Sequence, residues 1–329
     1  MTVHQPTNLD IGQWARLGPR GTYGQAIFGF AEENPKIVAL SADLGNSSGL
    51  DRFRITYPER FINVGIAEQN LVGVASGVSR SGFSVFASSF SPFIAMRASE
   101  QIRMNLGYMG ENVNLVAIGS GLSMGFLGNS HFGIEDAAVM RSIPGMRVVS
   151  PADCLEIVKV IEACIEFPAP TYIRLTGAPN GPKVYEEDYD FQIGKSIKLR
   201  EGKDVALVAT GSMVSAALVA CDILYENGIS AEVVNMHTIK PIDTKALNEI
   251  SDRHNFIVTI EEHSIIGGLG SAIAEYLCEL GTGCRLKIIG LPDRFGPTAD
   301  YKFLLEHHGL TGNAIARTVE TFLAGMNND

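Results

Sequence analysis

The sequence predicts an α/β protein with two consecutive domains, each built on a mostly parallel sheet flanked by helices. Short apolar segments alternate with segments of helical periodicity, 35 glycines provide strand-to-helix turns, and the alternation is interrupted once near the middle of the chain. Continuous apolar strands separated by helices are typical of parallel sheets covered on both faces. With 329 residues, 46% of them hydrophobic, the chain can bury two such cores.

The first alternation is expected to form a domain over residues 1–190. Its buried strands are expected at 36–40, 83–88, 112–118, 146–150 and 170–175. Its helices are expected at 67–80, 92–106, 133–143 and 152–165. A short apolar strand over Phe61, Ile62 and Val64 leads into the first of these helices.

The second, smaller domain is expected over residues 191–329. Residues 178–203 combine Pro, Gly and many charges, which predicts the connection between the domains. The strands that follow are expected at 204–210, 230–236, 256–262 and 285–290. The helices are expected near 212–227, 243–253, 268–281 and 311–324.

The composition disfavours several kinds of partner. The formal net charge is −10, whereas a nucleic-acid partner needs a basic surface. No run of 18 apolar residues predicts a membrane span, and the polar N-terminal segment lacks the apolar core of a signal peptide. The five cysteines are scattered and form no CxxC pair. We therefore expect reduced thiols and a cytoplasmic protein.

The helix expected at 67–80 begins with an acid and carries small residues on one side. Glu68 lies in its first turn, and Gly73 and Gly77 are four positions apart. Small side chains at that spacing allow another element to pack close to the helix. Glu68 is either a surface acid favoured at a helix N-terminus or an acid with a buried partner.

Four segments, in order, resemble the C-terminal half of transketolases. They are "RFINVGIAEQN", "SSFSPFIAMRASEQIRMN", "GNSHFGIEDAAVMRSIPGMRVVSPAD" and the series "VALVATGSMVSAALVA", "VVNMHTIKPID" and "VTIEEHSIIGGLG". The resemblance extends over about residues 15–325 and matches the thiamine diphosphate-binding pyrimidine domain followed by the transketolase C-terminal domain. Several motifs in the right order are more specific than any one of them.

The resemblance implies a catalytic role for Glu68. In the family, the glutamate at this position hydrogen-bonds the aminopyrimidine ring of thiamine diphosphate and so assists loss of the proton from the thiazolium carbon. Such a carboxyl group shares a proton with the ring, which favours its removal from water. The implied reaction is transfer of a two-carbon ketol unit from a ketose to an aldose.

Further cofactor contacts are implied at Phe90, Phe93, Met96, Ile66 and Asp43. The two phenylalanines match ring-stacking positions, and Met96 stands where the family usually has a third aromatic residue. A thioether can still pack against a ring. The alternative for this segment is ordinary core at a strand end. For Asp43 it is a loop residue that bonds its own backbone.

Substrate contacts are implied at Arg20, Ser47 and His131. Arg20 and Ser47 match positions that bind the sugar phosphate, for which the guanidinium fork is suited. The alternative for Arg20 is a solvated surface residue. His131 matches a histidine that contacts the donor ketose near its reacting carbonyl, and we expect it to be catalytic with Glu68.

Three departures from the family pattern concern the substrate. Gly119 and Gly177 stand where transketolases usually carry a phosphate-contacting His and Arg, and Leu127 replaces an acid that reads a sugar hydroxyl. An Arg at such a site is hard to replace. Strand alternation points Arg174 away from the side of Leu175. We therefore expect a non-standard sugar, such as a sulfonated, deoxy, branched or nucleotide-linked one.

The metal-binding motif of the family is missing. The family holds the diphosphate through Mg²⁺ with a "GDG" motif, which does not occur in this sequence. We therefore expect no metal ligands here and Mg²⁺ ligands on a partner chain. That partner would be the N-terminal, diphosphate-binding subunit of a split transketolase, with two copies of each chain.

Residues 261–270, "EEHSIIGGLG", join a strand to a helix. Helix N-termini bind anions, but the adjacent acids argue against a phosphate site, so a structural role is expected. Two other functions stay open for the whole chain. One is the beta subunit of a 2-oxoacid dehydrogenase, and the other is a non-catalytic scaffolding paralogue.

Overall fold

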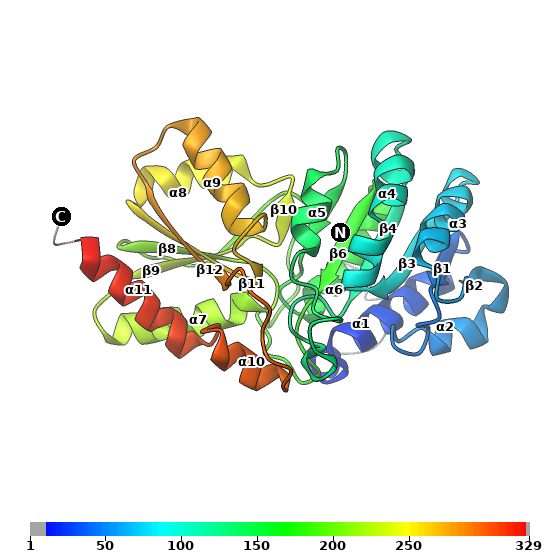
Figure 1. Ribbon diagram of the computed structural model, residues 1–329, viewed down its shortest axis with the longest axis horizontal. Coiled ribbons are helices and arrows are strands. Elements are labelled where there is room, and N and C mark those ends of the chain that lie inside the picture. The colour runs from blue at the N-terminus through cyan, green and yellow to red at the C-terminus, as the bar shows by residue number, and fades with distance from the viewer. Residues whose placement is uncertain (1–10, 327–329) are drawn as a thin grey trace.

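A computed structural model describes residues 11–326, so the first ten residues of the expected N-terminal domain lie outside it. Two sheets stand side by side, each between two layers of helices (Figure 1). Both sheets are mostly parallel, which confirms the predicted fold class. Every strand and helix predicted from the sequence periodicity lies within a few residues of its expected place, except for the helix expected at 92–106.

The first sheet has seven strands in the order β10-β5-β6-β4-β3-β1-β2. Only β10 is antiparallel to its neighbour. The strands are β1 (Ile37–Ser41), β2 (Phe61–Asn63), β3 (Ser84–Phe90), β4 (Val113–Ile118), β5 (Arg147–Val149), β6 (Thr171–Leu175) and β10 (Thr238–Lys240). The edge strand β10 comes from the second half of the chain and crosses to the first sheet. It is only three residues long, so the periodicity of the sequence cannot predict it.

Helices cover both faces of the first sheet. One face packs against α3 (Glu68–Arg80), α4 (Ser99–Ile102) and α5 (Asp136–Ser142). The other packs against α1 (Ile11–Glu33), α2 (Asp51–Thr56) and α6 (Cys154–Glu166). The segment expected as one helix at 92–106 is instead a short α4 between two π-helical turns, η2 (Phe93–Arg97) and η3 (Arg103–Tyr108). Such π turns are common at functional sites.

The second sheet has five strands in the order β12-β11-β8-β9-β7. They are β7 (Ile197–Arg200), β8 (Val205–Ala209), β9 (Ala231–Asn235), β11 (Phe256–Ser264) and β12 (Arg285–Leu291). Helices α7 (Met213–Glu226) and α11 (Gly312–Met326) cover one face, and α8 (Thr244–Arg253) and α9 (Leu269–Leu280) cover the other. The sequence analysis missed α1, α2, α10 (Tyr301–His307) and β7, which lies inside the predicted connection.

A buried acid on α6 joins the two halves of the chain. Glu156 is fully buried, and burial raises the pKa of its carboxyl. It accepts hydrogen bonds from the Ala152 amide (2.6 Å), the Tyr189 hydroxyl (2.6 Å) and Asn235 Nδ2 on β9 (2.9 Å). Because these partners belong to the loop before α6, to the connection and to the second sheet, the acid fixes the domain junction.

His237 is buried beside this junction, and we expect it to make stability depend on pH. Its ring contacts Phe191 with centroids 4.4 Å apart, and burial lowers its pKa to about 4. The unfolded chain binds a proton near pH 6.5, whereas the folded chain does not. Stability is therefore lost as the pH falls from about 6.5 to about 4, by about 2–3 kcal/mol.

Urea unfolding tests this expectation. Over this pH range the free energy of unfolding should fall less in His237→Gln than in the native chain. His307→Gln is the control, because His307 is exposed. If the free energy of unfolding depends on pH equally in the native and His237→Gln chains, His237 is not the source of the pH dependence.

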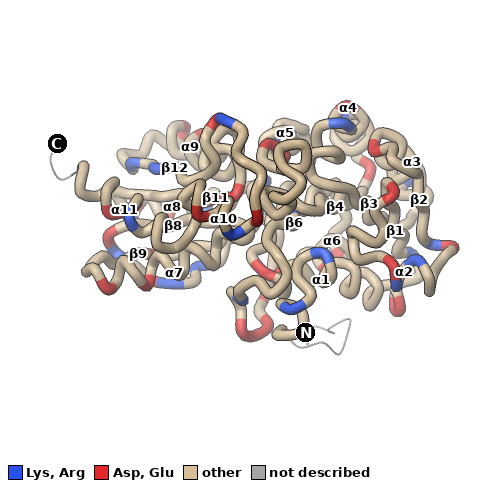
Figure 2. The backbone as a smooth tube through the Cα atoms, turned by 60° about the horizontal axis from the view of Figure 1, so that its bottom comes forward, with Lys and Arg blue, Asp and Glu red and all other residues tan. Residues whose placement is uncertain are grey.

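The surface charge is mixed in sign. Figure 2 shows acidic and basic residues interspersed along both halves of the chain. All five cysteines are free thiols, as predicted. No helix within residues 11–326 is both long and apolar enough to cross a membrane.

Candidate active site

Glu68 is the first residue of α3, and its side chain is 1% exposed. A turn at Gly65, which has a φ of 76°, turns the chain from β2 into this helix. Oε1 accepts a hydrogen bond from Ser89 Oγ (3.0 Å), and Oε2 forms an ion pair with Arg97 Nη1 (2.5 Å). The acid therefore has partners inside the chain. A buried acid must be paired, and its partner Arg97 lies one residue after Met96 in the same motif, a pairing that the sequence analysis missed.

Aromatic rings adjoin this acid. The Arg97 guanidinium lies 4.6 Å from the ring centroid of Phe93, the first residue of η2. Phe90, which ends β3, meets Phe93 edge to face at 6.0 Å. His131 closes the group, with its ring 5.5 Å from Phe90 and 5.1 Å from Phe93. The structure thus brings the predicted Glu68, Phe90, Phe93 and His131 together.

The remaining predicted cofactor contacts lie at the surface. Ile66 and Met96 are 78% and 51% exposed. Asp43 is exposed, adopts a φ of 60°, and accepts a hydrogen bond from Asn63 Nδ2 (3.1 Å). Exposed apolar side chains beside a buried acid leave this face of the chain suited to contact with a ligand or a partner.

The glycine face of α3 is also open. A Cβ atom added at Gly73 or Gly77 would meet nothing within 4 Å. Tyr108 and Met109, at the end of η3, are 82% and 50% exposed. Within residues 11–326 no other element packs closely on these glycines, so the close packing predicted from their spacing would need a second chain.

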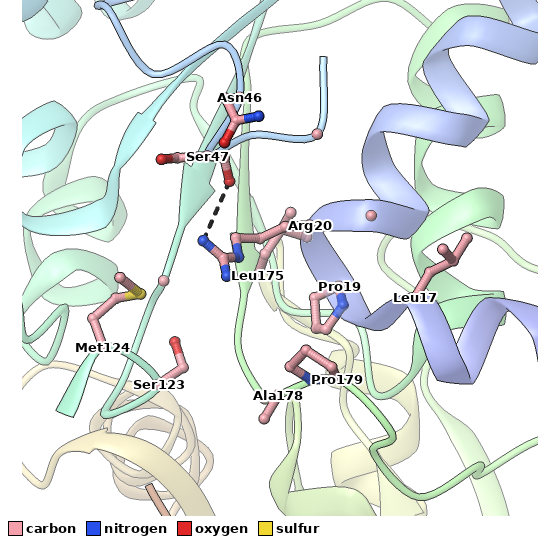
Figure 3. A pocket seen from close by; sticks show the side chains of 14 residues that line it. Leu17, Pro19, Arg20, Asn46, Ser47, Ser123, Met124, Leu175, Ala178 and Pro179 are labelled. Carbon is pink, nitrogen blue, oxygen red and sulfur yellow. Dashed lines mark hydrogen bonds between the residues drawn. The ribbon is translucent and has the colours of Figure 1, made fainter. Parts of the chain in front are cut away.

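Arg20 and Ser47 line a second cavity of about 310 Å³. Arg20 Nη1 donates to the Ser47 carbonyl (3.4 Å), and its guanidinium reaches between Ser47 and Ser123 (Figure 3). Gly119 and Gly177 also line the cavity, as their family positions predicted. Arg20 is the one charged side chain among the described residues of its wall.

Gly119 and Gly177 cannot simply be replaced by the side chains usual in the family. Gly119 has a φ of 68°, and a Cβ atom there would lie 2.5 Å from Met124 Cγ. Gly177 has more room but a φ of 91°, which L residues rarely adopt. Arg174 forms a buried ion pair with Asp136 (2.8 Å), away from the cavity, as strand alternation predicted. Leu127 is 41% exposed on the turn η4 (Gly125–Leu127).

The segment 261–270 offers no free anion site. Glu261 lies within β11, not after it, and its carboxylate accepts hydrogen bonds from the Leu269 (2.7 Å) and Gly270 (2.8 Å) amides. These are the amides that an anion at the start of α9 would use. Glu261 therefore already satisfies the amides that an anion would need.

The donor set suits the pyrimidine part of thiamine diphosphate. A buried carboxyl group can share a proton with a ring nitrogen, and Phe90 and Phe93 provide apolar surface for a flat ring. Mg²⁺ instead requires several oxygen ligands. No group of three or more His, Cys, Asp or Glu within residues 11–326 could hold a metal ion. The described residues thus fit the ring but not the metal.

Comparison with known proteins identifies the two domains. Two family models match: the transketolase pyrimidine-binding domain over residues 18–178, and the transketolase C-terminal domain over residues 194–315. Together they span most of the chain and meet at the segment that connects the two sheets.

Several similar proteins have nearly the same length. A putative transketolase C-terminal section from Methanocaldococcus jannaschii is 42% identical and covers 92% of this chain and 95% of its own. A 6-deoxy-6-sulfo-D-fructose transketolase subunit from Clostridium sp. strain MSTE9 is 39% identical, with 96% of both covered. A solved split-gene transketolase, described as an inactive beta4 tetramer, is 43% identical with a TM-score of 0.84, covering 93% of this chain and 98% of its own. This chain therefore belongs to the transketolase family, of which it carries the pyrimidine-binding and C-terminal domains.

Proposed function

We propose that this chain is the cofactor-activating subunit of a thiamine diphosphate-dependent transketolase that moves a two-carbon ketol unit from a ketose to an aldose. One observation carries the proposal: a buried carboxyl group, Glu68, lies at the head of α3 and pairs with Arg97, whose guanidinium lies over Phe93 in the ring cluster of Phe90, Phe93 and His131. Such a group is expensive to bury and is retained where its proton is used.

Each side chain takes a defined role. Glu68 hydrogen-bonds the aminopyrimidine ring, with Ser89 and Arg97 fixing its carboxylate. Phe90 and Phe93 pack on that ring. His131 hydrogen-bonds the donor sugar near the reacting carbonyl. When bound, thiamine diphosphate supplies the nucleophilic carbon and the electron sink for the transferred unit.

Three exposed residues complete the cofactor site from its open side. Met96 and Ile66 offer apolar surface against the cofactor, and Asp43 lies where cofactor and subunits meet. Exposure in the single chain is what a site shared between two chains requires.

A partner chain supplies the rest of the site. It is the N-terminal, diphosphate-binding subunit of a split transketolase, it carries the Mg²⁺ ligands, and two copies of each chain form the assembly. The open face of α3 and the exposed Ile66, Met96 and Tyr108 support this arrangement. The free cysteines support a cytoplasmic location.

The substrate is a non-standard sugar. The cavity around Arg20 and Ser47 binds the end of the sugar remote from the reacting carbons. Among the described residues that line it, the guanidinium of Arg20 is the one charged group, whereas the family usually adds a His and an Arg that contact the phosphate. The similarity to a transketolase subunit named for a sulfonated fructose supports this choice.

Calorimetric titration of thiamine diphosphate with Mg²⁺ tests the proposal. We expect no binding to this chain alone and saturable binding once the diphosphate-binding chain is added, followed by ketol transfer. Tight binding to the single chain would reveal a diphosphate site of its own. Turnover with a 2-oxoacid, without ketol transfer, would favour the dehydrogenase function. If thiamine diphosphate bound neither to the single chain nor to the two chains together, the non-catalytic scaffolding function would be favoured.

A further inference from the structure

The loop that carries His131 is held by the second half of the chain. This loop runs from the end of β4 to α5, and its neck is closed by two hydrogen bonds between Gly121 and Gly133 (2.7 and 3.0 Å). Just inside the neck, the Leu122 amide donates to Glu262 Oε1 (2.6 Å). Glu262 lies on β11, in the second sheet, 140 positions away.

Glu262 ties three elements to one carboxylate. Its side chain is 1% exposed. While Oε1 takes the loop amide, Oε2 accepts from Ser212 Oγ (2.5 Å), just before α7, and from the Tyr301 hydroxyl (2.7 Å) on α10. Because both oxygens of the buried Glu262 carboxylate have fixed donors, the carboxylate is held in one orientation. It therefore also fixes the Leu122 amide that it binds.

The fit between this acid and the loop is tight. Gly121 has a φ of 70°, and a Cβ atom there would lie 2.2 Å from Glu262 Oε1. A second tie runs beside it, since Arg174 Nη2 donates to the carbonyls of Gly133 (3.1 Å) and Glu262 (3.3 Å). The loop therefore has little room to shift without breaking contacts with β11.

The far end of the loop is anchored in the same half of the chain. Asn129 Nδ2 donates to the Gly296 carbonyl (3.0 Å), and a Cβ atom at Gly125 would touch Leu304 of α10. His131, in the same loop, faces the first sheet and packs against Phe90 and Phe93. Glu262, Gly296 and Leu304 all belong to the second half of the chain, although His131 works in the first.

We propose that Glu262 is a positioning residue, through which the C-terminal domain holds the His131 loop in its working place. The inference rests on the proposed function, because His131 is the group that contacts the sugar. It gives the "EEHSIIGGLG" segment two separate tasks: Glu261 caps α9, and Glu262 orients the loop.

The first test needs no activity. Backbone amide hydrogen exchange is compared in the native chain, Glu262→Ala and Glu156→Ala. Glu156 is a matched control, since it is equally buried at the domain junction and, like Glu262, accepts hydrogen bonds from a backbone amide and two hydroxyl groups. We expect Glu262→Ala to speed exchange at residues 120–134 about tenfold or more. Glu156→Ala should leave that loop unchanged. Equal effects of both variants on the loop would overturn the proposal.

The second test is a double-mutant cycle in the assembled enzyme with its partner chain. We expect Glu262→Ala to lower kcat about 10–100-fold, since small displacements of a positioned group are costly. In a His131→Asn background the same change should lower kcat less than about threefold. Equal losses in both backgrounds would mean a merely structural role. Glu262→Gln, which keeps an acceptor for the Leu122 amide, should recover most of the rate.

The two tests separate two kinds of failure. If the assembly has no ketol transfer at all, the proposed function fails, while the exchange experiment still decides whether Glu262 holds the loop. If Glu262→Ala does not fold, Tyr301→Phe removes one donor to the same carboxylate and takes its place in both tests.

Discussion

Replacing Glu68 by glutamine is expected to lower ketol transfer by the assembled enzyme by about 10²–10⁴-fold, the range for loss of a proton-transfer group. The amide has nearly the same shape, so it can still accept from Ser89 Oγ. It cannot share a proton with a ring nitrogen. Because the fold and the ring contacts persist, binding of thiamine diphosphate should weaken much less than turnover falls. Calorimetry and initial rates on the same preparation measure the two effects.

Glu156→Gln is the control for this experiment. Glu156 is as buried as Glu68 and also lies on a helix, but its partners belong to the domain junction. Its substitution should change the unfolding midpoint and leave kcat within about threefold of native, since it touches no reacting group. A Glu68→Gln enzyme with nearly native turnover would contradict the catalytic role given to Glu68.

Replacing Arg20 by glutamine is expected to lower kcat/KM about 10–100-fold for sugars that carry a phosphate or sulfonate. A hydrogen bond to a charged group contributes about 1.5–3 kcal/mol. Arg20 is the one charged side chain among the described residues lining its cavity, so no neighbour there replaces it. For an uncharged analogue the same substitution should change kcat/KM little. Rates with matched phosphorylated, sulfonated and neutral ketoses give the comparison.

Arg16→Gln is the matched control, because Arg16 lies only four residues away, before the kink in α1 at Gly18, but is exposed and does not line the cavity. It should leave all three substrates unaffected. If Arg20→Gln weakened the neutral and the anionic sugars equally, the cavity would not be the anion-binding end of the substrate site.

The sequence by itself determined the α/β fold and much of the site, because both depend on local order. Alternation of apolar strands and amphipathic helices records which face of each element is buried, and this is enough to predict two parallel sheets. Motifs placed Glu68 at a helix start, Phe90 and Phe93 at the junction of a strand and a helix, and Arg20 and Ser47 at positions that bind the sugar phosphate. Each of these positions follows from residues close in the chain or from a resemblance that keeps them in order.

Only the tertiary structure decided how these parts are held. The pairing of Arg97 with Glu68 depends on where the irregular turn η2 points that side chain, which spacing does not reveal. Met124 occupies the space that a side chain at Gly119 would need, although neither residue signals the other in the sequence.

The longest connections are the least visible in the sequence. Strand β10 crosses to the first sheet, and Glu262 reaches a loop amide 140 positions away. Periodicity reports whether a residue is buried, but not against which distant residue it is buried. That choice is made when the two sheets pack together, because each buried polar group must then find a partner at the junction.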